Sequence, residues 1–219
     1  SNLAVRVDNS EIQTVNTFAV DVSMFYQSEE NNYGDFNGRW RAGVNLSNMG
    51  PKVELVLGGD ESFIPTNLKL GGGFDFILDN SNTITTNLEL NKLLVPTPPI
   101  RDASGEVISG KDDDVGFLKG MFQSFYDAPR GFEEEMEEFI WQASAEYLYN
   151  EVFSVRAGYF HESANKGNRQ FFTLGTGFKF RSTTLDVSYL INASDVNNPL
   201  ESTLRFSLTI NLGDSYAYF

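Results

Sequence analysis

The chain contains no cysteine and a single histidine among its 219 residues. It can therefore form neither disulfides nor thiolate metal sites, and the lack of cysteine is compatible with an oxidising cell envelope. No apolar run approaches the roughly 20 residues of a membrane helix, so any membrane crossing has to be made by strands. Cationic residues are also scarce. The net charge of −14 argues against nucleic acid as a partner, because its phosphates would be repelled.

Long alternating strands are the main feature that is present. Large apolar residues occupy every second position in segments of about ten residues, the length with which a tilted strand crosses a bilayer. In the last segment, for example, Leu204, Phe206 and Leu208 alternate with Arg205 and Ser207. The nine predicted strands cover residues 15–27, 39–47, 67–78, 84–91, 139–149, 153–159, 172–180, 185–192 and 204–212.

The two faces of these strands differ in charge. One face is almost uncharged and rich in Phe, Leu, Val, Tyr and Trp. The other face carries Asp21, Arg39, Arg41, Lys69, Asp75, Glu89, Glu146, Arg156, Arg169, Lys179, Asp186 and Arg205. Mixed charges can pair inside a barrel, whereas a charge facing lipid costs about 2–4 kcal/mol at the bilayer midplane. The pattern predicts an all-β fold, a transmembrane antiparallel β-barrel, in preference to a soluble β-sandwich.

The connections and the strand count add further expectations. Short turns alternate with longer connections, of which 93–137 is the longest, and this fits short inner turns and long outer loops. Bacterial single-chain barrels have even strand numbers, so nine strands predict that further strands precede residue 1. The chain opens at Ser1 without methionine or a signal peptide, which fits a mature product or a fragment. We expect residues 1–219 to form one barrel domain and residues 1–14 to form a loop.

Residues 93–137 interrupt the strand pattern, and loops of that length are usually functional or disordered. The segment 115–126 is helix-like, with apolar residues at spacings of one, three and four. Such residues would bind a partner if exposed, or plug the barrel mouth if buried. The stiff segment 95–99 either docks a partner or only routes the chain over the rim. The candidate partner-binding residues are Val95, Pro96, Pro98, Phe117, Leu118, Met121, Phe122, Phe125 and Tyr126.

Patterns for catalysis or metal binding are weak. The acidic groups at 112–114 and 133–135 lack EF-hand spacing, which favours a solvated acidic loop over a calcium site. His161 could act as a general base with Ser163 as nucleophile, but the sequence has no nucleophile elbow and no clear third member of a catalytic triad. Glycines 71–73 lie in a strand rather than in a phosphate-binding loop. We therefore expect no catalytic residue, no metal, no cofactor and no enzyme activity.

Five short segments spread over nearly the whole chain form a distinctive set. They are 90–99 (LNKLLVPTPP), 124–129 (SFYDAP), 156–162 (RAGYFHE), 166–175 (KGNRQFFTLG) and 198–208 (NPLESTLRFSL). Each alone is weak, but in this order they resemble the PorV family of outer-membrane proteins of the type IX secretion system in Bacteroidota. The resemblance implies a FadL-like barrel of about 14 strands, of which this chain would be the C-terminal portion.

The resemblance also implies a function in protein transport. Members of the family bind the C-terminal signal domain of secreted cargo at the translocon and carry the cargo to a cell-surface attachment complex. The implied partners are the translocon barrel SprA or Sov, the C-terminal domains of cargo proteins, the attachment complex with the sortase PorU, and membrane lipid and lipopolysaccharide. The implied location is the bacterial outer membrane, with the loops facing the exterior.

Two other functions stay open at this stage. A FadL-like barrel could transport hydrophobic small molecules, although the charged inner positions argue against a continuous apolar path. The resemblance also leaves open a protein related to lipid A deacylation, in which His161 would be the residue to examine.

Overall fold

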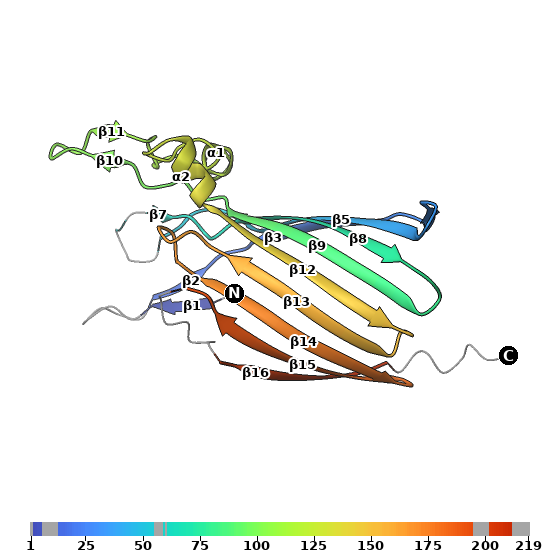
Figure 1. The fold of residues 1–219 in the computed structure, drawn as a ribbon. Helices are drawn as coiled ribbons and strands as arrows, with labels where there is room; N and C mark the ends of the chain where they lie inside the picture. The colour runs from blue at the N-terminus through green and yellow to red at the C-terminus, as the bar shows by residue number, and fades with distance from the viewer. Residues whose placement is uncertain (1, 6–12, 55–58, 60, 195–201, 212–219) are drawn as a thin grey trace. The chain divides into compact units, whose positions relative to one another are not determined.

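The computed structural model describes residues 2–5, 13–54, 59, 61–194 and 202–211 (Figure 1). The elements are β1 (Asn2–Val5), β2 (Gln13–Asn16), β3 (Val20–Gln27), β4 (Asn31–Asn32), β5 (Asn37–Met49), β6 (Val53–Glu54), β7 (Glu61–Ser62), β8 (Asn67–Ile77), β9 (Asn82–Leu93), β10 (Ile100–Arg101), β11 (Val107–Ser109), α1 (Phe117–Gln123), α2 (Phe132–Glu137), β12 (Phe139–Tyr149), β13 (Phe153–His161), β14 (Gln170–Phe180), β15 (Thr183–Asn192) and β16 (Leu204–Ile210). Neither helix in this part of the chain is long and apolar enough to span a bilayer.

One sheet contains all nine predicted long strands. Its order is β16-β15-β14-β13-β12-β9-β8-β5-β3, with the short strand β4 paired to β5. The pairs from β12 to β16 are antiparallel and follow one another along the chain. The predicted all-β, antiparallel fold is therefore confirmed. The predicted end of the last strand at residue 212 lies outside the described residues.

The N-terminal segment, predicted to be a loop, instead contains β1 paired antiparallel with β2, from Asn2 opposite Asn16 to Val5 opposite Gln13. The predicted strand 15–27 is correspondingly divided into the end of β2 and the separate strand β3. The prediction was wrong here because it followed apolar alternation, whereas a hairpin needs only backbone pairing between residues that tolerate an extended conformation.

The insertion contains more structure than the sequence indicated. The predicted helix 115–126 is present as the shorter α1, and Pro129 follows soon after its end. The helix α2 and the hairpin β10–β11 were not predicted. α2 begins after Gly131, whose φ of 71° is favourable for glycine, and three glutamates occupy its first turn, where the helix dipole favours negative charge.

The chain divides into two compact units, which we describe separately. The loop unit consists of Ser1–Met24, Val44–Leu70 and Asn91–Phe139, and it contains both helices. The strand unit consists of Phe25–Gly43, Gly71–Leu90 and Ile140–Phe219.

The strand unit exposes its apolar face. Leu174, Phe178 and Phe206 are 52%, 52% and 69% exposed, whereas Ser154 on the polar face is 3% exposed. A soluble sheet protein buries its large apolar side chains and exposes its polar ones. The reverse arrangement is the one required of strands whose apolar face contacts lipid.

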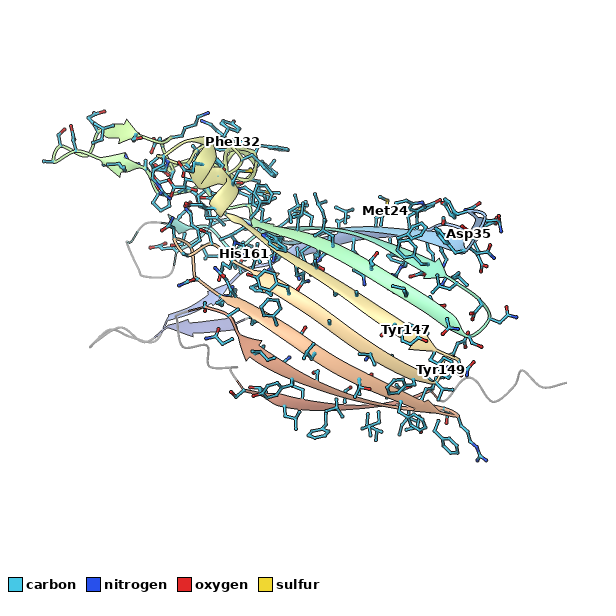
Figure 2. The ribbon with its side chains drawn as sticks, in the orientation of Figure 1. Met24, Asp35, Phe132, Tyr147, Tyr149 and His161 are labelled. Atoms are coloured by element: carbon cyan, nitrogen blue, oxygen red, sulfur yellow. The ribbon has the colours of Figure 1, made fainter. Side chains whose placement is uncertain are left out.

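Aromatic residues lie at both ends of this apolar face. Trp141, Tyr159 and Phe172 are ring neighbours at one end, with centroid distances of 5.4 and 4.7 Å. Tyr147 and Tyr149 lie near the other end of β12 (Figure 2). The eight residue steps from Trp141 to Tyr149 span roughly 26 Å along the strand, or about 20 Å across a membrane at the usual tilt. Aromatic girdles flank the apolar band of outer-membrane barrels at a comparable separation of about 25 Å.

The polar face carries charge pairs, as the sequence predicted. Asp75 is buried and forms salt bridges with Arg39 and Arg41, at 3.1 and 2.9 Å. Arg156 pairs with Glu146, its register partner on β12, and with Asp186 on β15. Opposite charges on adjacent strands, or on strands one apart, therefore neutralise one another on the face that does not meet lipid.

An arginine placed on the apolar face is expected to destabilise the protein more than an arginine on the polar face. Leu174→Arg should lower the free energy of unfolding by about 2–4 kcal/mol, because the charge enters the hydrocarbon. Thr173→Arg should cost less than about 1 kcal/mol, because Thr173 lines a recess of about 430 Å³ on the polar face. Urea titrations of the full-length protein in lipid vesicles, followed by tryptophan fluorescence, measure the free energy of unfolding of both variants. Equal costs would mean that the apolar face does not meet lipid.

Candidate partner-binding loop

A buried lysine anchors the segment that follows β9. Lys92 is 1% exposed, and its Nζ lies 2.6 Å from Glu138 Oε2 and 3.3 Å from Glu135 Oε2. Thr97 donates from Oγ1 to Glu138 Oε1 at 2.6 Å. Because Glu135 belongs to α2 and Lys92 to the end of β9, these contacts fasten the second helix to the sheet strand from which the insertion starts.

Asp127 extends the buried cluster. Its Oδ2 accepts the Thr97 amide at 3.2 Å, and Glu135 Oε1 accepts the Ala128 amide at 2.8 Å. Asp127 Oδ1 is buried and has no hydrogen-bond partner among the described residues. Burial raises the pKa of the Asp127 carboxyl, the Thr97 amide opposes this, and the negative charges of Glu135 and Glu138 add to the rise. Two carboxylates, those of Glu135 and Glu138, thus contact the Lys92 ammonium at the base of the loop, and Asp127 is buried beside them.

The first helix is seated by close packing. A side chain on Gly120 would meet the ring of Phe63 at 2.6 Å and Pro96 at 3.0 Å, so only glycine fits between them. Gln123 donates from Nε2 to the Asp112 carbonyl at 2.8 Å, and Ser124 donates to the Met121 carbonyl at 2.8 Å. The Gln123 contact ties α1 to the preceding segment, whereas the Ser124 bond is local to the end of the helix.

The structure separates the predicted binding residues into two groups. Phe122 is 70% exposed, and Leu118, Tyr126, Phe125 and Pro98 are also exposed. Met121 and Pro96 are buried, and Val95 and Phe117 are half-buried. The buried residues hold the helix in place, whereas the exposed ones form the surface that a partner could contact.

Two exposed residues were missed by the sequence analysis. Phe132 is 76% exposed and Met136 is 46% exposed, and they lie one helical turn apart on α2. Their spacing of four was visible in the sequence, but the surrounding glutamates led us to expect a solvated acidic loop. We define the apolar helical surface by the six exposed residues of this region, Leu118, Phe122, Phe125, Tyr126, Phe132 and Met136.

Acidic residues accompany this surface, and several are paired with arginine. Arg101 contacts Asp112 and Asp113 at 2.7 Å each, and Arg130 pairs with Glu134 and Glu137. The hydrogen bond from Arg101 lowers the pKa of Asp112. In the described ranges, no group of three or more histidine, aspartate and glutamate residues is arranged to hold a metal ion.

His161 lies among aromatic rings. Its ring is stacked on Trp141 with centroids 5.3 Å apart, and Tyr159 is also a ring neighbour. The Ser163 hydroxyl accepts a hydrogen bond from the Asn165 amide at 3.4 Å. Nearby, Glu162 is buried and binds Arg169 through both oxygens at 2.6 and 3.0 Å, which raises the pKa of Arg169. This neighbourhood orders a connection between strands and places His161 in the aromatic girdle.

Comparison with known proteins identifies the family. No curated protein matches the chain. Residues 1–100 match the family model described as type IX secretion system protein PorV, which covers the chain from β1 through Ile100. This match agrees with the exposed apolar strand face and with the motifs at 90–99. The match over residues 1–100 supports a PorV protein of the type IX secretion system, a family of outer-membrane secretion components.

Proposed function

We propose that this outer-membrane protein binds the C-terminal signal domain of secreted cargo at the translocon, of the SprA or Sov type, and carries it to the attachment complex with its sortase PorU. In this proposal the segment 93–137 faces the cell exterior. The observation that supports it is the apolar helical surface, six large apolar side chains held outward by a buried base. Exposed apolar groups on a fixed scaffold are typical of protein-binding sites.

The rigidity of the base supports binding over passive covering. A surface that is already ordered loses little conformational entropy when a partner docks. Lys92, Asp127 and Glu135 are each at most 4% exposed, so the helices are positioned by contacts that a partner need not supply. A helix that only plugged a barrel mouth would turn its aromatic residues inward, but Phe122 and Phe132 are mostly exposed within the loop unit.

The transporter alternative has less support. A recess of about 430 Å³ on the strand unit is lined in part by Arg41, Asn87, Glu89 and Gln142. A hydrophobic small molecule would have to pass these polar groups and the nearby pair of Arg41 with Asp75. The lipid A alternative rests on His161, whose ring stacks on Trp141 as part of an aromatic cluster.

Photo-crosslinking from Phe122 in cells is expected to capture proteins. A photoreactive residue at Phe122 of the full-length protein should yield adducts with the C-terminal domains of secreted proteins or with the translocon, identified by mass spectrometry. The same probe at Leu174, on the apolar strand face, should yield mainly lipid adducts. If Phe122 captured only lipid, or only this chain itself, the helices would be a cover and the proposed function would be wrong.

A further inference from the structure

We infer that the partner of the apolar helical surface presents an apolar patch bordered by lysine and arginine side chains, and that this patch belongs to a protein and not to lipid headgroups. The inference rests on the proposed function and adds to it the chemistry of the binding partner. It is carried by the distribution of charge around the surface, which the family assignment does not describe.

Negative charge is concentrated in the segment that carries the surface. Residues 91–139 contain five lysines and arginines and eleven aspartates and glutamates, a net charge of −6 out of the chain's −14. The helix α2 alone has four glutamates among its six residues. An excess of one sign on a binding surface selects partners of the opposite sign and accelerates their encounter.

Part of this excess negative charge is carried by exposed side chains. Lys92, Asp127 and Glu135 are buried, so they cannot meet a partner. Glu133, on the same helix as Phe132 and Met136, is exposed. Asp114 precedes α1, and its side chain is 92% exposed although Lys52 lies 3.3 Å away.

The ion pairs within this segment do not cancel its negative charge. Arg101 is shared by Asp112 and Asp113, and Arg130 is shared by Glu134 and Glu137. Each arginine therefore faces two carboxylates, and the local sum stays negative. A partner with a basic border would be attracted by this net negative charge, while its apolar groups contact the exposed Phe122 or Phe132.

The same charge disfavours a lipid surface as the partner. Apolar helical residues that insert into a membrane interface are normally accompanied by lysine and arginine, which attract lipid phosphates. Here Lys111 lies over the Tyr126 ring, but residues 91–139 contain eleven aspartates and glutamates against five lysines and arginines, so the segment as a whole repels phosphates. Within a distance of about 8–10 Å, physiological salt does not screen this repulsion fully.

Charge reversal tests the inference with the full-length protein and a photoreactive residue at Phe122. The variant Asp114→Lys with Glu133→Lys is expected to lower the yield of the main protein adduct about tenfold at low salt, and less at high salt. The neutral variant Asp114→Asn with Glu133→Gln should lower it about threefold. The matched control, Glu29→Lys with Asp35→Lys, makes the same change of charge at exposed positions of the strand unit and should stay within about twofold of the parent.

The outcomes separate this inference from the proposed function. A protein adduct whose yield is the same in the parent and in both Asp114 and Glu133 variants would overturn the basic border while leaving the proposed function standing. An equal fall in the control would likewise overturn it, because the effect would come from net charge alone. Lipid adducts only, in the parent protein, would overturn the proposed function itself.

Discussion

Replacing Lys92 by methionine is expected to detach the insertion from the end of β9. The change removes the positive charge that lies 3.3 Å from Glu135 and 2.6 Å from Glu138, and both carboxylates are largely buried. Leaving buried charges without their partner typically costs about 3–5 kcal/mol. Hydrogen exchange of the full-length protein in lipid nanodiscs should show protection of amides 94–138 falling by roughly two to three and a half orders of magnitude.

Two further variants test whether this loss of protection comes from the contacts of Lys92 with Glu135 and Glu138. Lys119→Met removes an exposed lysine from α1 and should change protection by less than tenfold. Adding Glu135→Gln and Glu138→Gln to Lys92→Met removes the uncompensated charges and should restore a substantial part of the protection. Amides of β13 and β14 serve as an internal reference that stays protected. Unchanged protection of 94–138 in the single variant would show that the cluster does not hold the loop.

The strands were predictable because their signal is local. In β14 the alternation of Phe172, Leu174 and Phe178 with Thr173 and Gly175 is visible in eleven residues, and it reports directly which face is apolar. The direction of that face, outward toward lipid, followed from the charged residues on the opposite face. Strand neighbours also followed from chain order, since consecutive antiparallel strands usually pair.

The insertion was less predictable because its structure depends on distant contacts. Glu135 is buried only because Lys92, 43 residues earlier in the chain, reaches it. In the sequence it is one glutamate in an acidic run, and such runs are usually solvated. Met121 and Phe122 are adjacent apolar residues, yet one is buried and the other is exposed. Which of them faces outward depends on where Phe63 and Pro96 lie, and helical spacing alone does not contain that information.

The double variant Phe122→Asp with Phe132→Asp is expected to abolish delivery of cargo to the cell surface. Central aromatic residues of an interface each contribute about 2 kcal/mol or more, so affinity should fall on the order of a thousandfold. Both side chains are more than two thirds exposed, so the substitutions should cost only about 0.5 kcal/mol each in folding. The variant should therefore still insert into the outer membrane, where it would bind cargo too weakly to carry it.

The matched control is Ile108→Asp. Ile108 is 66% exposed and lies on β11 in the same loop unit, outside the apolar helical surface. It tests whether any new carboxylate on an exposed apolar residue of the insertion has the same effect. Delivery by Ile108→Asp should stay close to that of the parent protein.

The most direct test of the central claim is the amount of secreted cargo on the surface and in the periplasm of cells carrying the parent protein, the double variant or Ile108→Asp. We predict that cargo accumulates in the periplasm only with Phe122→Asp and Phe132→Asp, while all three proteins are present in the outer membrane at similar levels. Normal surface delivery by the double variant would contradict the claim that the apolar helical surface recognises cargo or translocon.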